Sequence, residues 1–297
     1  MWEVFASSQV AARRIWPSLI APLESDPNFR ISVTNSHEAL QQAVDDAVDS
    51  GVSRFVAAGG DGSIHLVVNA VLRHTWSTAP AIATIPLGTG SDFARHFKIP
   101  LVPAEAIELA RGDAPTFQLA DVGTAEGDWG TQHFVNVASI GLTAEVVRTA
   151  ALMRGLGTAR YYLALAMTLP FYRRRRTEIQ SEDVDRDEKC IACVIANCQY
   201  FGGGVRVLPR AASNDGKLDI LTASANSVQF VPLLRRLFAE QHMGAHRTWD
   251  HQTSSISFRC EPASAVEMDG EYIGNTPVRF GVIPNAIRVL CPASDSR

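Results

Sequence analysis

The chain has 297 residues, a formal net charge of −4, 46% hydrophobic residues and 20% charged residues. This length predicts two domains or one large one, and the composition is typical of a soluble globular protein. The small negative net charge gives no indication of a nucleic-acid partner. The five cysteines are odd in number and occur in a long chain, so we expect core thiols rather than a disulfide framework.

The termini and the apolar segments give no sign of export or of a membrane span. The N-terminus lacks the basic-then-apolar order of a signal peptide. The longest apolar stretch, 161–172, contains Pro170 and is shorter than the roughly 20 residues that span a bilayer. We therefore expect a cytoplasmic protein. The basic run 173–176 follows this stretch and leaves two interpretations: peripheral contact with an anionic membrane, or a core helix followed by a solvated strand.

In the first part of the chain, predicted strands and helices alternate. Strands are expected over 1–10, 29–34 and 55–58, with an amphipathic helix over 11–23 and a helix over 37–49 that Ser36 caps. Such alternation with short links predicts an α/β domain with an open, mostly parallel sheet over residues 1–116. Ligands bind at the carboxyl ends of the strands in such sheets.

The second part, 117–297, reads as a mainly β domain. Helical insertions are expected over 143–168 and 228–242, and the last strand or tail could return to the first domain. The expected strands are 117–122, 133–139, 190–197, 217–223, 255–259, 278–282 and 287–290.

The first candidate site follows the strand at 55–58, in the sequence GGDGS. Its glycines would allow positive φ and the close approach of a phosphate, and the following helix would add free N–H groups. The alternative is an ordinary strand-to-helix turn with Asp61 as the helix cap. A P-loop is excluded because no Walker lysine is near. The residues concerned are Gly59, Gly60, Asp61, Gly62 and Ser63.

A second loop of the same kind comprises Gly88, Thr89 and Gly90, followed by Asp92 at the start of a helix. It offers backbone donors, a hydroxyl group and a carboxylate. The alternative is again a loop in which Asp92 caps the helix. Two such loops at neighbouring strand ends favour one phosphate site shared by both.

Two turns in the second part carry carboxylates. Asp215-Gly216 and Asp269-Gly270 both suit tight hairpin turns. Glu271 directly follows the second turn, and a carboxylate at a turn tip is a candidate general base.

These motifs together resemble the diacylglycerol-kinase-type lipid kinases, a family with small bacterial soluble diacylglycerol kinases, YegS-like kinases and, more distantly, sphingosine and ceramide kinases. The resemblance runs in order from about Thr34 to Pro292. The matching segments are GGDGSIHLVVNAVL, PLGTGSDFAR, FVNVASIGLTAEVV, NCQYFGGGVRVLP, NDGKLDI and MDGEYIGNTPVRFGVIPNAIRVLCP.

The resemblance implies an α/β nucleotide-binding domain and a β-sandwich domain, with the active site in the cleft between them. It implies an ATP-dependent lipid kinase that transfers the γ-phosphate to a hydroxyl of a lipid such as diacylglycerol, with Mg²⁺. The partner would be a lipid substrate at a membrane surface, and a homodimer is compatible with it.

The family roles can be carried to matching positions of this sequence. Glu271 would be the general base, Asp61 and Asp92 would lie near the reacting phosphate, and Asp215 would hold a magnesium ion with the backbone carbonyl of Lys217. The nucleotide-contacting positions would be Thr34, Gly59, Gly60, Asp61, Gly62, Ser63, Gly88, Thr89 and Gly90.

Three departures from the family pattern concern the nucleotide site. The usual Asn-Pro-x-Ser-Gly turn after the first strand is replaced by residues from VFASSQVAARR, where Ser7, Ser8 or Arg14 could substitute. Leu66 removes a usual acidic side chain, and Ser91 stands where Asn is common. These changes keep a non-catalytic nucleotide- or lipid-binding sensor open as an alternative, and NAD kinases share the GGDG loop.

Overall fold

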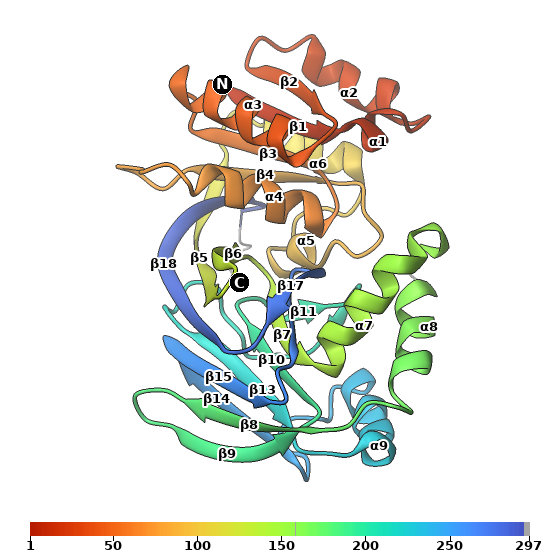
Figure 1. The fold of residues 1–297 in the computed structure, drawn as a ribbon. Coiled ribbons are helices and arrows are strands. Elements are labelled where there is room, and N and C mark those ends of the chain that lie inside the picture. The colour runs from red at the N-terminus through yellow and green to blue at the C-terminus, as the bar shows by residue number, and fades with distance from the viewer. Residues whose placement is uncertain (158, 294–297) are drawn as a thin grey trace. The chain divides into compact units, whose positions relative to one another are not determined.

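The computed structural model describes residues 1–157 and 159–293 (Figure 1). Residue 158, inside the expected insertion 143–168, and residues 294–297, in the expected tail, lie outside the described residues. The chain divides into two compact units. Unit 1 comprises Met1–Ala120 with Asn285–Arg297, and unit 2 comprises Asp121–Pro284.

Unit 1 is built on a parallel sheet with the strand order β2-β1-β3-β4-β18. Strand β2 lies on one side of β1, and β3 and β4 follow on the other side. The carboxyl ends of β1 and β3 are therefore a topological switch point. The strands are β1 (Trp2–Ser7), β2 (Phe29–Thr34), β3 (Arg54–Gly59), β4 (Ala81–Pro86) and the C-terminal part of β18 (Val278–Cys291).

Helices cover both faces of this sheet. One face packs its alternate apolar residues, such as Val4 and Val56, against Leu19 and Ile20 of α2 and Ile107 of α6. Helices α3 and α4 contact each other, and each contacts the sheet. The α/β class with a mostly parallel sheet is thereby confirmed. The helices are α1 (Ser8–Ala11), α2 (Trp16–Glu24), α3 (His37–Asp49), α4 (Asp61–Val71), α5 (Asp92–His96) and α6 (Pro103–Arg111).

The expected bounds of the elements in unit 1 are confirmed where the sequence shows a helix-capping residue or a regular apolar period. Strand β2 and helix α3 have the expected bounds, and Ser36 Oγ accepts a hydrogen bond from Ala39 N at 3.1 Å. The expected helix over 11–23 was wrong at its start. Ser7 caps the separate short helix α1, α2 begins only at Trp16, and Ile15 stays 53% exposed.

Unit 2 contains an antiparallel sheet with the order β14-β13-β10-β7-β16-β17. Its strands are β7 (Val137–Gly141), β10 (Ala192–Ala196), β13 (Leu218–Ala223), β14 (Thr248–Thr253), β16 (Ala265–Met268) and β17 (Glu271–Asn275). The opposing strands are β5 (Thr116–Gly127), β6 (Gly130–Phe134), β8 (Arg175–Gln180), β9 (Asp185–Cys190), β15 (Ser255–Glu261) and the N-terminal part of β18. A short hairpin pairs β11 (Tyr200–Phe201) with β12 (Val205–Arg206).

A single apolar core lies between these two layers. Ile179, Phe258 and Phe280 come from one layer, while Ile140 and Ile195 come from the other. This arrangement confirms the mainly β sandwich. The expected core thiols are also confirmed, because all five cysteines are buried and none forms a disulfide.

The helices of unit 2 interrupt this sandwich. The expected insertion over 143–168 is divided into α7 (Leu142–Ala150), a 3₁₀ turn (Ala151–Leu156) and α8 (Ala159–Thr168). The second insertion is α9 (Ser227–Phe238), whose cap Asn226 accepts a hydrogen bond from Gln229 N. In the described chain, no helix combines the length and the apolar character needed to cross a bilayer.

Four expected strands differ from the structure. The segment 133–139 is divided into β6 and β7, and 190–197 is divided at Ile191 between β9 and β10, so each forms parts of two different sheets. By contrast, 278–282 and 287–290 form one strand, β18. It pairs with β15 at Val278–Gly281 and with β4 at Arg288–Val289, so it belongs to both units.

Candidate functional site

The carboxyl edge of the sheet in unit 1 gathers the expected nucleotide-contacting residues. Thr34 is the last residue of β2 and pairs with Ser7 of β1, while Gly59 at the end of β3 pairs with Pro86 at the end of β4. Since parallel strands end at the same edge, Thr34 and both glycine-rich loops lie along one row.

In the first loop, Gly59 and Gly60 are needed for space rather than for an unusual backbone conformation. None of Gly59, Gly60 and Gly62 has a positive φ, which corrects the expectation. A Cβ at Gly59 would lie 2.0 Å from Ser63 Oγ, and one at Gly60 would lie 3.2 Å from the Cα of Gly88. At Gly62 a Cβ would meet no atom within 4 Å. Side chains at the first two positions would therefore push the loop apart.

The second loop packs its backbone directly on the first. A Cβ at Gly88 would lie 2.5 Å from the Cα of Gly60, and Leu87 N donates a hydrogen bond to Gly59 O at 2.8 Å. Ser91, which precedes α5, has a left-handed φ of 55°. Asparagine tolerates this conformation better than serine does, which gives a physical reason for the residue common in the family.

Asp61 joins the two loops. It is the first residue of α4, and Gly60 occupies the cap position, so Asp61 does not cap its own helix. Its Oδ1 instead accepts a hydrogen bond from Phe93 N in α5 at 3.0 Å. Asp92, which precedes Phe93 as the first residue of α5, is buried. The carboxylate of Asp61 thus fixes the second loop against the first.

Arg13 is a residue of this edge that the sequence analysis missed. It follows α1, is exposed, and its Nη1 donates a hydrogen bond to Leu87 O at the start of the second loop. Arg14, the next residue, was one of the three replacement contacts expected for the missing turn. The missing Asn-Pro-x-Ser-Gly turn was the signal for a substitute contact in this region. The structure after β1 is needed to show that Arg13, and not Arg14, contacts the second loop.

In unit 2, the turn before Glu271 is fixed by Asp269. Its carboxylate accepts hydrogen bonds from the backbone N–H groups of Val135, Asn136 and Val137 at 2.9, 2.8 and 3.2 Å. These bonds hold the break between β6 and β7, which explains why 133–139 is not one strand. Glu271 is the exposed first residue of β17.

A second carboxyl group, which is buried, supports the same turn. Glu267 Oε1 lies 2.6 Å from Ser139 Oγ, and its Oε2 accepts a hydrogen bond from Gly270 N at 3.0 Å. Burial raises the pKa of Glu267 from 4.5 to about 8, and the nearby charges of Asp269 and Glu271 add to the effect. Glu267 is therefore largely protonated at neutral pH. The sequence pattern did not indicate Glu267 as a candidate site residue.

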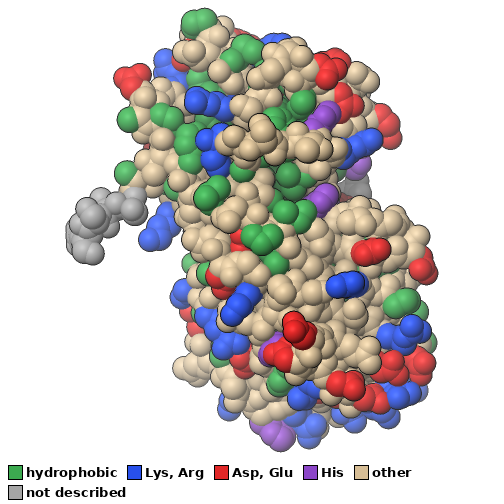
Figure 2. Space-filling view, turned by 90° about the vertical axis from the view of Figure 1, so that its left-hand side faces the viewer, with side chains coloured by type: hydrophobic (Ala, Val, Ile, Leu, Met, Phe, Trp, Pro, Cys, Tyr) green, Lys and Arg blue, Asp and Glu red, His purple; other side chains and the backbone are tan. Residues whose placement is uncertain are grey.

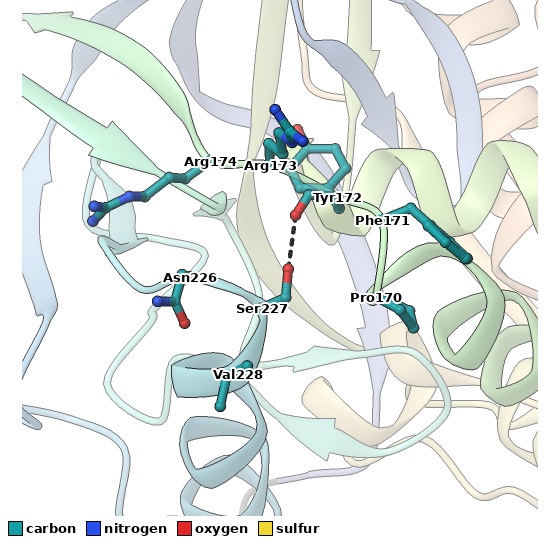
Figure 3. A pocket seen from close by; sticks show the side chains of 8 residues that line it. All are labelled: Pro170, Phe171, Tyr172, Arg173, Arg174, Asn226, Ser227 and Val228. Atoms are coloured by element: carbon teal, nitrogen blue, oxygen red, sulfur yellow. Dashed lines mark hydrogen bonds between the residues drawn. The ribbon is translucent and has the colours of Figure 1, made fainter.

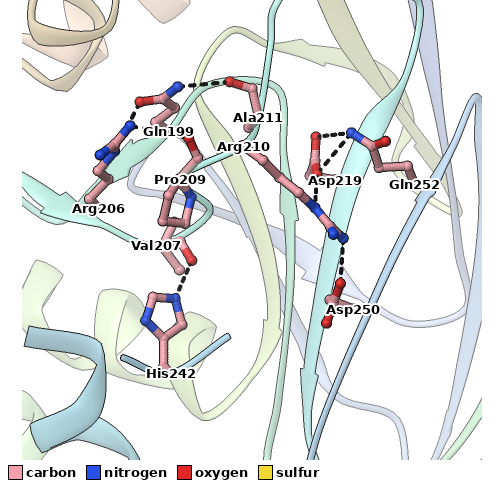
Figure 4. A network of polar contacts seen from close by, with 10 residues as sticks. All are labelled: Gln199, Arg206, Val207, Pro209, Arg210, Ala211, Asp219, His242, Asp250 and Gln252. Atoms are coloured by element: carbon pink, nitrogen blue, oxygen red, sulfur yellow. Dashed lines mark hydrogen bonds and ion pairs between the residues drawn. The ribbon is translucent and has the colours of Figure 1, made fainter. Parts of the chain in front are cut away.

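The turn at Asp215 is closed by carboxylates. Asp215 Oδ1 accepts a hydrogen bond from Lys217 N at 3.0 Å, and the buried Asp121 accepts one from Gly216 N at 2.7 Å. Nearby, Asp219 bonds Arg210 and Gln252, and Arg210 also bonds Asp250 (Figure 4). Burial raises the pKa of Asp219, and Gln252 and Arg210 oppose that shift.

The turn at Asp215 is the place expected for the magnesium ion. An exposed Asp215 carboxylate with the Lys217 carbonyl is an all-oxygen donor set, which suits a hard cation. In the described ranges, however, no three or more His, Cys, Asp or Glu side chains come together as a metal-binding group. An ion here would therefore rely on backbone carbonyls and water for its remaining ligands.

Comparisons with known proteins agree with this two-unit organisation. Residues 5–122 match the family described as "Diacylglycerol kinase catalytic domain", and residues 136–291 match the "YegS C-terminal NAD kinase beta sandwich-like domain". A crystal structure described as that of a diacylglycerol kinase from Bacillus anthracis str. Sterne has a TM-score of 0.79 at 21% identity, covering 99% of this chain and 97% of that one. This likeness shows the fold.

Among curated proteins, the chain is similar to several named "Probable lipid kinase YegS-like". The one from Serratia proteamaculans is 27% identical over 91% of this chain and 86% of its own length. One from Pseudomonas aeruginosa is 27% identical over 98% of this chain and 93% of its own length. With a family match over more than half of its residues, the chain belongs to the diacylglycerol-kinase-type family, in the YegS-like branch.

Proposed function

We propose that this protein is a lipid kinase that transfers the γ-phosphate of ATP to the hydroxyl of a lipid such as diacylglycerol. The observation that carries the proposal is the pair of glycine-rich loops whose backbones touch at Gly60 and Gly88 and which Asp61 ties together through Phe93. The names of the curated relatives point to a lipid as the acceptor.

The loops would bind nucleotide phosphates mainly through the backbone. The first turn of α4 lies at this loop, and the backbone N–H groups and the dipole at a helix N-terminus favour an anion there. Gly62, on which a Cβ would meet no atom, leaves room for a phosphate to approach. Arg13 adds a positive charge beside the second loop, and Thr34 contributes a hydroxyl group to the same row.

Proton transfer is assigned to Glu271. Its carboxylate is exposed, while the turn beneath it is fixed by Asp269 and Glu267. A carboxylate held in this way can accept the proton of a lipid hydroxyl as the hydroxyl attacks the γ-phosphorus. Phosphoryl transfer depends mostly on positioning and charge neutralisation, so one base and well-placed donors suffice. Asp61 acts in this account by holding the second loop.

Magnesium, when bound, would neutralise phosphate charge. Asp215 with the carbonyl of Lys217 is the proposed protein site for a structural magnesium ion.

A lipid-panel assay tests the proposal. Purified protein is given ATP with a labelled γ-phosphate, magnesium and, separately, diacylglycerol, phosphatidylglycerol, sphingosine and NAD. We expect label in at least one lipid and none in NAD. Transfer to NAD alone would replace the proposal by an NAD kinase. ATP binding in calorimetry without transfer to any acceptor would support a non-catalytic sensor.

A further inference from the structure

An exposed apolar surface surrounds the junction of α8 and α9 in unit 2. Within the described part of α8 only Ala164 is buried, so the interpretation of 161–172 as a core helix was wrong. Phe171 after α8 is 85% exposed, and Val228 at the start of α9 is 81% exposed. Tyr162, Met167 and Val231 are also exposed. We call this the α8–α9 face. An exposed apolar patch of this kind on a folded protein marks an interaction site.

The two helices present this face together because they share one buried cluster. Tyr172 and Phe230 are buried in it, and Leu165, Leu169 and Leu233 pack against it. Ser227 Oγ also donates a hydrogen bond to Tyr172 O at 2.7 Å (Figure 3). The segments that carry Phe171 and Val228 are therefore packed on the same buried cluster and fixed next to each other.

The two segments that form this face carry basic residues and no acidic ones. The sequence contains no acidic residue between Glu145 and Glu178, and none between Asp219 and Glu240. Elsewhere in unit 2, Arg176 pairs with Asp187, and Figure 2 shows positive and negative side chains interspersed on the side that it presents. Two segments of this length without a carboxylate stand out in a chain whose formal net charge is −4.

Two arginines of this face are available for a ligand. Arg173 and Arg174 are exposed and form no hydrogen bond or ion pair with the residues that the structure describes, whereas Arg175 donates to Pro262 O at 3.1 Å. Both line an open cavity of about 510 Å³ together with Phe171, Asn226 and Val228 (Figure 3). Arginine binds phosphate oxygens in a bidentate manner.

We propose that the α8–α9 face docks on a bilayer that contains anionic phospholipids. Arg173 and Arg174 contact lipid phosphates at the cavity, and Phe171 and Val228 enter the boundary of the acyl chains. Apolar side chains next to arginines, in segments without carboxylates, are the pattern of helices that lie in a membrane interface. The inference deepens the proposed function by naming the surface that would meet a bilayer-borne substrate.

Vesicle binding without ATP tests the inference independently of kinase activity. Sedimentation with vesicles of phosphatidylcholine alone is compared with vesicles that also contain phosphatidylglycerol. We expect binding only to the second kind, falling as salt rises. The variant Arg173→Gln/Arg174→Gln should bind about 30-fold more weakly, since each arginine near an anionic surface contributes about fivefold. Phe171→Ser/Val228→Ser should also release the protein.

The matched control is Arg259→Gln/Arg279→Gln, which removes the same charge from exposed arginines on β15 and β18. It should bind as the wild type does. Equal binding to both kinds of vesicle, no binding by the wild type, or an equal loss in the control would overturn the inference. Loss of self-association in Phe171→Ser/Val228→Ser, with no vesicle binding by the wild type, would assign the face to a protein contact instead.

The two proposals can fail separately. All of these variants should keep the melting temperature of the wild type, because the side chains are exposed. If vesicles are bound as expected but no lipid accepts phosphate, the docking face stands and the proposed kinase activity fails.

Discussion

The two regions with candidate roles are positioned by different means. In unit 1, the glycine-rich loops are placed by backbone contact, with Gly60 against Gly88 and one carboxylate, Asp61, as a tie. In unit 2, the turn before Glu271 is placed by the buried carboxyl group of Glu267 and the half-buried carboxylate of Asp269, which bind backbone N–H groups.

This difference decides which substitutions each region tolerates. The contact between the loops of unit 1 is disrupted when atoms are added, because there is no space for a Cβ between Gly60 and Gly88. The turn of unit 2 fails when hydrogen-bond acceptors are removed or when a buried carboxyl group gains a charge. The first region should therefore respond to steric changes and the second to pH.

The largest expected effect concerns Glu267. Its pKa is about 8 in the folded chain against an ordinary value of 4.5, so between these pH values the folded state holds a proton that the unfolded state has lost. The stabilisation is complete below about pH 4.5 and is lost as the pH rises through about 8. Relative to Glu267→Gln, the free energy of unfolding of the wild type should fall by up to about 1.4 kcal/mol per pH unit in this window.

Urea unfolding of both proteins from pH 5 to pH 9 measures this difference. The amide of Glu267→Gln should accept the hydrogen bond of Gly270 and donate one to Ser139, as a protonated carboxyl group does. The variant should thus fold normally and lack this dependence on pH. Parallel curves for the two proteins would contradict a raised pKa at Glu267.

The next effect concerns Gly88→Ala. The added Cβ would lie 2.5 Å from the Cα of Gly60, so the two loops would have to separate. We expect a loss of about 1–3 kcal/mol in the free energy of unfolding and no ATP binding in calorimetry. Gly62→Ala is the control, because its Cβ would meet no atom within 4 Å; its stability should not fall. Normal ATP binding by Gly88→Ala would show that the contact between the loops does not form the site.

A smaller effect is expected from Asp61→Ala. This change removes the acceptor of Phe93 N, which acts as a helix cap supplied from another helix, at a cost of about 1 kcal/mol. Asp61→Asn keeps an acceptor oxygen and should retain most of the stability. Thermal unfolding of the two variants distinguishes them, and equal stability losses would argue that the charge, rather than the hydrogen bond, ties the loops together.

The smallest effect concerns Ser91, with its φ of 55°. Asparagine is tolerated better than serine in the left-handed region, so Ser91→Asn should raise the free energy of unfolding by about 0.5 kcal/mol. The change should also leave the contact between the loops intact. Urea unfolding measures it, and a destabilised Ser91→Asn would mean that the serine hydroxyl has a role at this position.

Local signals in the sequence predicted part of this structure well. The cap at Ser36 and a regular apolar period placed α3, and the glycine-rich loops stood out because few residue types fit where two backbones touch. The division at 133–139 could not be predicted, because it depends on Asp269, which is distant in sequence. The raised pKa of Glu267 depends on burial, which a short alternating segment does not reveal. The apolar run in α8 suggested a core helix, but only the fold shows which side of it is covered.

One measurement tests the central claim most directly: the rate of γ-phosphate transfer from ATP to a lipid hydroxyl by the wild type, by Glu271→Gln and by the control Glu261→Gln, which changes another exposed glutamate of unit 2. The account predicts that Glu271→Gln lowers kcat by about 10²- to 10⁴-fold, the usual contribution of a general base, with ATP affinity unchanged. Glu261→Gln should match the wild type. A Glu271→Gln variant that transfers phosphate at the wild-type rate would contradict the account.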